Sequence, residues 1–222
     1  MHVSTPGIYF AFRDRHDVRE TDALPRRPAN HYVRSKLAAE KLVERAHSEG
    51  LSTVTLRPRA IYGPGDTAIL PRLIGALEAK RLVRIGGGRT VTDLTYIENA
   101  VEALVLALDA PEDVSGRAFN ITDGEPIELW PFVDQLCALL ELQPPSRSIP
   151  YGVAASYAAL LELLHRTLLR GREPMFTRYS VALLARSLTL DISAARRDLG
   201  YAPVVAPREG LERFAAWWRE RR

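Results

Sequence analysis

The strongest constraint on the fold is an alternation of short β-type runs with helical runs along the first two thirds of the chain. Strand-like runs lie at residues 2–6, 52–58 and 117–124, and helical runs at 32–50, 68–80, 97–111 and 129–142. Strands that alternate with helices need crossover connections, and such connections join parallel neighbours. The sequence therefore predicts an α/β fold with a parallel sheet.

After Pro150 the pattern changes to mostly helix. The predicted helices are residues 152–169, about 178–186, 192–198 and 208–221. We interpret this part as a smaller, mostly helical lobe attached to the sheet.

Composition argues against several classes of function. The net charge of the 222 residues is only +3, and no Lys/Arg run is interleaved with aromatic residues, so nucleic-acid binding is not expected. The single cysteine, Cys137, can form no intramolecular disulfide and suits a reducing compartment such as the cytoplasm. The five histidines lack metal-ligand spacing, so no metal site is predicted.

Tyr32 and Lys36 stand four residues apart in a chain with only three lysines. On a helix this spacing places both side chains on one face, and a nearby ammonium lowers the pKa of a phenol from about 10 toward neutrality. Such a phenol can act as a general acid or base. Ser4 and Thr5, at the end of the first expected strand, offer a hydroxyl partner. The alternative is two unrelated residues on a surface helix.

Three segments in this order resemble the extended short-chain dehydrogenase/reductase family, which includes the NAD-dependent epimerases and dehydratases. They are "VSTPGIYF", "HYVRSK" and "LRPRAIYGPGD", and the later "DLTYIENAVEALVLAL", "AFNITDGEP" and "DISAARRDLGYAP" agree with it. Within the family the chain looks most similar to the 3β-hydroxysteroid dehydrogenase/isomerase-like branch, and residues 172–203 carry most of that likeness.

The resemblance implies a Rossmann-type fold and roles for individual residues. Residues 1–130 would form a truncated Rossmann-type catalytic domain, and residues 131–222 a mostly helical substrate-binding lobe. Tyr32 would be the general acid/base. Lys36 would lower its pKa and bind the nicotinamide ribose of NAD or NADP. Thr5, rather than Ser4, would be the catalytic hydroxyl, and the stretch from Pro58 to Ile61 would border the nicotinamide.

The family's N-terminal βαβ units, which carry the glycine-rich cofactor turn, have no counterpart in this sequence. The glycines at 86–88 open no expected helix and make a poor dinucleotide loop. We therefore expect only the catalytic half of the family fold. Three explanations for the missing cofactor-binding half remain open: a true start upstream, a fragmentary gene, or a shortened protein with another role. In the last case the chain would be a non-catalytic fragment that has lost its cofactor site.

Two features bear on the substrate. Sugar-nucleotide epimerases and dehydratases often carry an asparagine where this chain has Ala60, after Arg59, which favours an apolar, steroid-like or long-chain substrate over a sugar nucleotide. The apolar run at 152–171 is interrupted by Glu162, His165 and Arg166 and is no transmembrane span.

That run either covers the core or forms a lid that also touches a membrane surface, which Arg170 and Arg172 would suit. A homodimer through the Tyr–Lys helix and the next long helix is a further implication of the resemblance.

Overall fold

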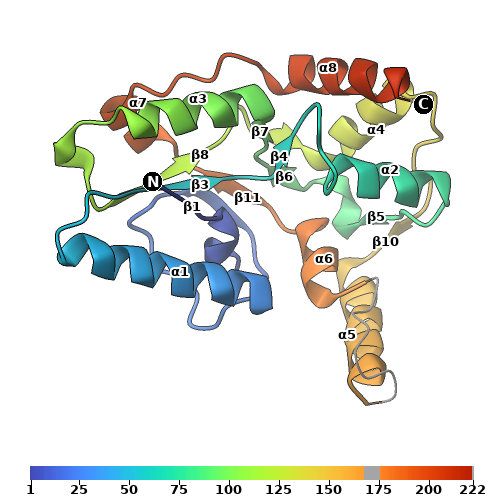
Figure 1. Ribbon diagram of the computed structural model, residues 1–222. Coiled ribbons are helices and arrows are strands. Elements are labelled where there is room, and N and C mark those ends of the chain that lie inside the picture. Colours follow the sequence, from blue (N-terminus) through green and yellow to red (C-terminus); the bar gives the residue numbers. More distant parts are fainter. Residues whose placement is uncertain (168–175, 222) are drawn as a thin grey trace.

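The centre of the molecule is a three-stranded parallel sheet between two helices. The computed structural model describes residues 1–167 and 176–221 (Figure 1). Its sheet has the order β1-β3-β8, formed by β1 (His2–Val3), β3 (Val54–Pro58) and β8 (Arg117–Ile121). Helix α1 (His31–Ser48) lies on one side of this sheet and α3 (Ile97–Leu108) on the other (Figure 1). The prediction of an α/β fold with a parallel sheet is confirmed.

Each face of the sheet packs against its own apolar cluster. On the α3 side, Leu56 and Phe119 pack against the alanines of α3 and against α7 (Ser193–Leu199) in one apolar cluster. Alanine at the contact allows the helix to approach the strands closely. On the α1 side, Tyr9 and Val33 belong to a second cluster that also holds part of the C-terminal region.

The first predicted strand is shorter than expected, because the chain turns into a 3₁₀ helix. Strand β1 ends at Val3, although the amide of Ser4 still donates to the carbonyl of Leu56 at 2.7 Å. Thr5 then caps η1 (Pro6–Tyr9): its Oγ1 accepts a hydrogen bond from the Gly7 amide at 3.1 Å. Pro6 has no amide hydrogen for a strand ladder and suits the first position of a helix.

A second sheet contains a strand that the sequence did not indicate. Strand β11 (Leu188–Leu190) lies in the region predicted to be helical, and it pairs in parallel with β2 (Arg15–Val18) and β6 (Val91–Thr92). Strand β9 (Ile127–Glu128) completes the order β2-β11-β6-β9. Three residues are too few for a periodic signal, and the pairing partners lie about 100 or more positions away in the sequence, where no local pattern reveals them.

The remaining predicted helices occur in the predicted order, with bounds that are shorter or shifted by one residue. The predicted helices 68–80 and 129–142 are α2 (Leu70–Glu78) and α4 (Leu129–Leu139), and the last is α8 (Pro207–Glu220). The short strands and 3₁₀ turns between the helices are β4 (Ile61–Tyr62), β5 (Arg84–Ile85), η2 (Gly86–Gly88), β7 (Thr95–Tyr96), η3 (Glu112–Val114) and β10 (Ser148–Ile149).

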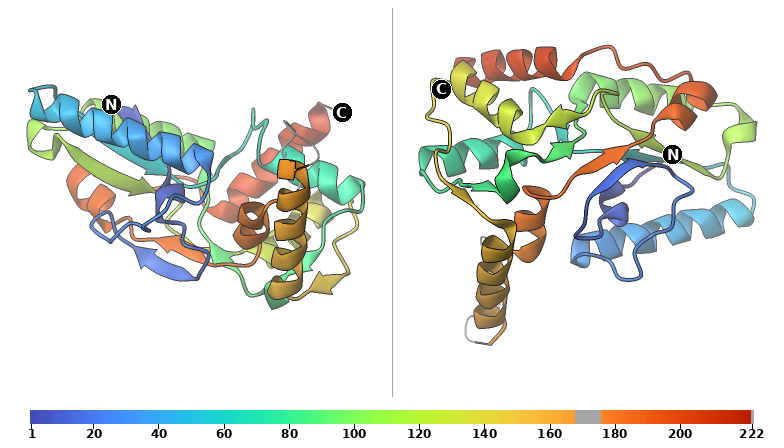
Figure 2. Two further views of the ribbon diagram at one scale, coloured as in Figure 1. Left: turned by 90° about the horizontal axis from the view of Figure 1, so that it is seen from below. Right: turned by 180° about the vertical axis from the view of Figure 1, so that it is seen from behind.

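Two helices of the C-terminal part leave the body of the molecule. Helix α5 (Tyr151–Thr167) projects outward, with α6 (Arg178–Leu183) at its base (Figures 1 and 2). Helix α6 ends at Leu183, earlier than the helix predicted at 178–186. Residues 168–169 of the helix predicted at 152–169 lie outside the described part. None of the described helices is long and apolar enough to cross a bilayer. The domain division at residue 130 stays a prediction.

Candidate active site

Tyr32 and Lys36 lie on the first two turns of α1, beside the end of β1. Asn30 begins the helix, because its side chain accepts a hydrogen bond from the Val33 amide at 2.8 Å. Lys36 Nζ donates to the Val3 carbonyl at 3.0 Å, which fixes the helix to the strand end. Tyr32 keeps 53% of its surface exposed. The pair predicted from spacing is thus anchored at one end and accessible at the other.

The structure distinguishes the two candidate hydroxyls. Ser4 is buried and its Oγ has no hydrogen-bond partner in the described chain, whereas Thr5 is partly exposed at the start of η1. Gly7 lets η1 approach α1, because a Cβ there would lie 3.3 Å from Thr5 Oγ1 and 3.4 Å from Val33 Cγ2. An accessible hydroxyl can reach a substrate oxygen and a buried one cannot, which favours Thr5.

Pro58 and Ile61 line a small apolar cavity on the opposite face of the sheet, of about 30 Å³. Its other walls come from the three strands and from α3: Val3, Leu56, Ala100, Ala103, Leu104 and Ile121. Val3 therefore lines this cavity with its side chain and accepts from Lys36 with its carbonyl. Val3 thus links the cavity at Pro58 and Ile61 to Lys36 on the other side of the sheet.

Helix α6 closes the α1 side of this region. Tyr179 of α6 packs edge-on against Phe10, with ring centroids 5.0 Å apart. Burial raises the pKa of Tyr179, and the nearby Arg59 guanidinium partly offsets that rise, while Tyr32 adds to it. The charges of Arg59 and Tyr32 thus act on Tyr179, which belongs to the C-terminal part of the chain.

A buried network beneath α1 was not foreseen from the sequence. Arg57 binds the carboxylate of Glu40 through two hydrogen bonds of 2.9 and 2.6 Å, and it also donates to the hydroxyl of Tyr9. The Tyr9 hydroxyl in turn donates to Asn120 Oδ1 at 3.1 Å. Burial acts to lower the pKa of Arg57, but Glu40 and Tyr9 outweigh it and the pKa is raised. This network joins α1, η1, β3 and β8.

Arg59, two residues further along the chain, has a different environment. Its Nη2 donates to Thr92 Oγ1 at 3.2 Å, while its Nε is buried with no hydrogen-bond acceptor in the described chain. Burial lowers the pKa of Arg59, and the neighbouring Tyr179 and Asp93 offset this only in part. The sequence showed Arg59 only as part of a departure from the epimerase pattern.

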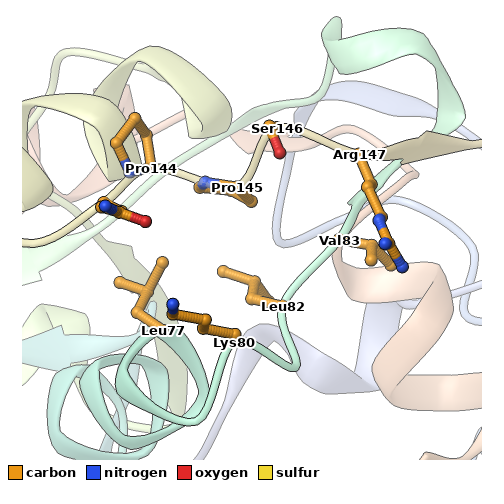
Figure 3. A pocket seen from close by; sticks show the side chains of 9 residues that line it. Leu77, Lys80, Leu82, Val83, Pro144, Pro145, Ser146 and Arg147 are labelled. Atoms are coloured by element: carbon orange, nitrogen blue, oxygen red, sulfur yellow. The ribbon is translucent and has the colours of Figure 1, made fainter.

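Other features of the described chain lie apart from this region. A pocket of about 330 Å³ between the α2–β5 connection and residues 143–147 is lined by Lys80 and Arg147 among others, and by none of the predicted site residues (Figure 3). The glycines at 86–88 form η2, which leads to β6 rather than to a helix. Residues 1–167 and 176–221 hold no cluster of His, Cys, Asp or Glu side chains suited to a metal ion.

The sequence of residues 2–151 matches the model of the 3-beta hydroxysteroid dehydrogenase/isomerase family. The chain belongs to this family. It is 38% identical over 212 residues to a 4-hydroxy-2-methyl-3-oxo-4-farnesyl-3,4-dihydroquinoline-1-oxide ketoreductase of Stigmatella aurantiaca, covering 96% of this chain and 63% of that protein. It is 33% identical over 227 residues to a 2-alkyl-3-oxoalkanoate reductase of Shewanella oneidensis, covering 97% of this chain and 59% of that protein.

The fold is that of the extended short-chain dehydrogenases. A UDP-glucuronic acid 4-epimerase from Bacillus cereus, solved with NAD, superimposes with a TM-score of 0.72 at 22% identity. The match covers 99% of this chain and 60% of that structure. The chain thus spans about 60% of the length of the relatives it matches, and the predicted membership of this family is confirmed.

Proposed function

We propose that the protein is an NAD- or NADP-dependent oxidoreductase that acts on a hydroxyl or keto group of an apolar substrate. The observation that carries the proposal is the hydrogen bond from the Lys36 ammonium to the Val3 carbonyl, which joins the helix that carries Tyr32 to the strand that leads into Thr5. The family match and the relatives named as reductases support this reaction class. The compounds in the names of these relatives, a farnesyl quinoline oxide and an alkyl-oxoalkanoate, support an apolar substrate.

We infer that these residues would hold the nicotinamide end of the cofactor. Pro58 and Ile61, which line an apolar cavity of about 30 Å³, would border the ring, and Lys36 would donate to a ribose hydroxyl. The bound cofactor would accept or supply the hydride. Thr5 would hold the substrate oxygen, and Tyr32 would take the hydroxyl proton in oxidation or return it in reduction.

Replacement of Tyr32 by Phe tests the proton-transfer role. The phenylalanine keeps the ring and removes the hydroxyl, so we expect turnover by the full-length protein to fall by about 10²-fold or more. Binding of NADH, followed by fluorescence titration, should stay within about threefold of the wild type. Turnover of apolar hydroxy compounds at the wild-type rate would refute the role. Failure of the wild type to bind either NADH or NADPH would favour a non-catalytic protein instead.

The sugar-nucleotide alternative has less support. Ala60 cannot offer the amide that the epimerase pattern provides, and the structural match to the epimerase lies below 25% identity, where only the fold is shared. Turnover assays with nucleotide sugars beside apolar hydroxy compounds separate the two candidates.

We also propose that α5 rests on a membrane surface. Its solvent-facing side carries Val153, Tyr157, Leu160 and Leu163, each at least half exposed, while Glu162 turns away and pairs with Arg178 of α6 at 2.8 Å. The stripe is about 16 Å long. The surface of such a stripe is smaller than the roughly 800 Å² per partner that a stable dimer buries. It is sufficient for shallow insertion into a bilayer interface. The predicted contributions of Arg170 and Arg172 lie outside the described residues.

Vesicle flotation tests this contact. We expect the wild type to float with vesicles of phosphatidylcholine and phosphatidylglycerol at low salt, because five or so apolar side chains leave water together. Leu160→Glu should reduce the floating fraction at least severalfold. Leu42→Glu, at an exposed leucine of α1, is the matched control and should float like the wild type. An unchanged fraction in the Leu160 variant contradicts the proposal.

A further inference from the structure

The pocket of about 330 Å³ between the α2–β5 connection and residues 143–147 has a cationic lining (Figure 3). Lys80 and Arg147 are among the nine described residues that line it, and none of the nine is acidic. No ion pair within residues 1–167 and 176–221 includes either cation, and both residues are exposed. Protein pockets for small molecules begin at about 300 Å³, so this one has room for a small ligand. Its charge favours an anion.

Apolar side chains line the space between these two cations. Figure 3 shows Leu82 between Lys80 and Arg147. Pro144 and Pro145 line the wall of residues 143–147, and Pro145 is buried while Leu82 is half-buried. An inorganic anion would leave this apolar surface in water, whereas a ligand with an apolar ring would cover it. The lining therefore favours a ligand that combines a negative charge with an apolar body.

Arg84 holds the two walls of the pocket together. Its Nε donates to the Pro145 carbonyl at 2.9 Å, and its backbone amide donates to the Arg147 carbonyl at 2.9 Å. Its Nη2 pairs with Asp134 of α4 at 2.5 Å, so this carboxylate is already engaged. The walls are thus fixed by the chain itself, and a preformed site loses little conformational entropy when a ligand binds.

Lys80 has a backbone conformation that normally favours glycine. Its φ is +53°, and it follows the end of α2, where its amide donates to the Leu77 carbonyl and the Arg81 amide donates to the Ala76 carbonyl, both at 2.9 Å. Glycine is the usual residue at this position of a helix end, because a side chain is strained there. This chain has one of its three lysines at the position instead. Strain of this kind often accompanies function, which points to a use of the Lys80 side chain.

We propose that this pocket is a binding site for a phosphate monoester with an apolar body, and that Lys80 and Arg147 bind the phosphate. A phosphate monoester carries a charge of about −1.5 to −2 at pH 7 and three acceptor oxygens, which matches two cations better than a carboxylate does. Both cations are long, exposed side chains, so their charged ends can turn toward one anion. None of the residues predicted for catalysis or cofactor binding lines the pocket. The site is therefore independent of the proposed function.

Calorimetric titration of the full-length protein with 1-naphthyl phosphate, 1-naphthol and inorganic phosphate tests the inference. Naphthol keeps the ring without the phosphate, and inorganic phosphate lacks the ring. At an ionic strength of about 0.15 M, which screens nonspecific attraction, we expect 1-naphthyl phosphate to bind about tenfold or more tightly than either part. 1-Naphthoate, a carboxylate on the same ring, should bind about threefold or more weakly than the phosphate ester.

Lys80→Asn and Arg147→Gln remove the two cations one at a time. We expect each variant to bind 1-naphthyl phosphate about threefold or more weakly than the wild type, and the double variant about tenfold or more weakly. Asparagine tolerates the positive φ of position 80 better than lysine, so Lys80→Asn should resist urea at least as well as the wild type. Lys41→Gln, at an exposed lysine of α1, is the matched control and should bind like the wild type.

Several outcomes overturn the inference. Equal binding of the phosphate ester and naphthol, or no binding of the ester at millimolar concentration, shows that the pocket does not recognise phosphate. Equal binding of the ester and 1-naphthoate refutes the preference for a phosphate. An equal loss of affinity in Lys41→Gln and Lys80→Asn means that the attraction is nonspecific. Titration in the presence of saturating NADH distinguishes this pocket from a cofactor site: unchanged binding of the ester supports the pocket, and displacement by NADH contradicts it.

Discussion

Arg57 and Arg59 stand two residues apart on β3 and its continuation, and they have opposite electrostatic environments. Arg57 is buried with a bidentate partner in Glu40 and a further contact to Tyr9, and its pKa is raised despite burial. Arg59 has a neutral hydroxyl as its side-chain partner and a lowered pKa. The same residue type therefore lies in two different environments. Arg57 stabilises the fold beneath α1 through a buried ion pair, whereas Arg59 makes no ion pair within residues 1–167 and 176–221.

Two contacts hold α1, the helix that carries Tyr32, against the sheet. Glu40 lies one turn beyond Lys36 on α1, and its pairing with Arg57 holds the helix to β3. Lys36 holds the same helix to β1 through the Val3 carbonyl. Strands β1 and β3 thus both hold α1 in place, while the Tyr32 side chain remains exposed.

Matched substitutions by methionine give the largest expected effect. Arg57→Met leaves the buried Glu40 carboxylate without its partner, and we expect the free energy of unfolding to fall by about 3–5 kcal/mol. Arg59→Met removes a charge that makes no ion pair within residues 1–167 and 176–221, although it favours the carboxylate of Asp93, so we expect a change of about 1 kcal/mol or less, in either direction. Urea denaturation of both variants measures the difference. Equal losses would show that the two arginines have similar structural roles.

Asp93 provides a smaller effect that depends on pH. Burial raises the pKa of its carboxyl to about 6, although the Leu190 amide and Arg59 act to lower it. The folded protein therefore binds this proton more strongly than the unfolded chain. The resulting stability is present below pH 4 and is lost as the pH rises through about 6. Asp123, whose pKa is also raised by burial to about 6, acts in the same direction.

Asp93→Asn should remove its share of this slope, on the order of 2 kcal/mol between pH 7 and pH 4. Thermal melts over that range provide the measurement. Arg59→Met should shift the transition to higher pH, because the variant lacks the cation that favours the Asp93 carboxylate. A transition at the same pH in both proteins would mean that Arg59 and Asp93 do not interact.

Much of the fold and part of the site were predictable from local patterns. The periodicity of α1 and the apolar run of β3 indicated a helix and a buried strand, and the Tyr32–Lys36 spacing indicated a shared face. Strand β11 could not be predicted, because three residues carry no period and its partners lie far away in the sequence. The pairing of Arg57 with Glu40 was equally hidden, since nothing local distinguishes it from any other arginine and glutamate.

The sequence by itself determined the order of strands and helices and the residues that resemble a known catalytic set. The elements and the motifs both depend on residues a few positions apart in the sequence, so the amino-acid sequence specifies them directly. Only the tertiary structure decided which charges are neutralised. Arg57 and Arg59 are both arginines next to Pro58, and the difference between them arises from Glu40 on α1 and from Thr92, Asp93 and Tyr179 on two other segments. Electrostatic partners are chosen by distance in space, and only the folded chain sets that distance.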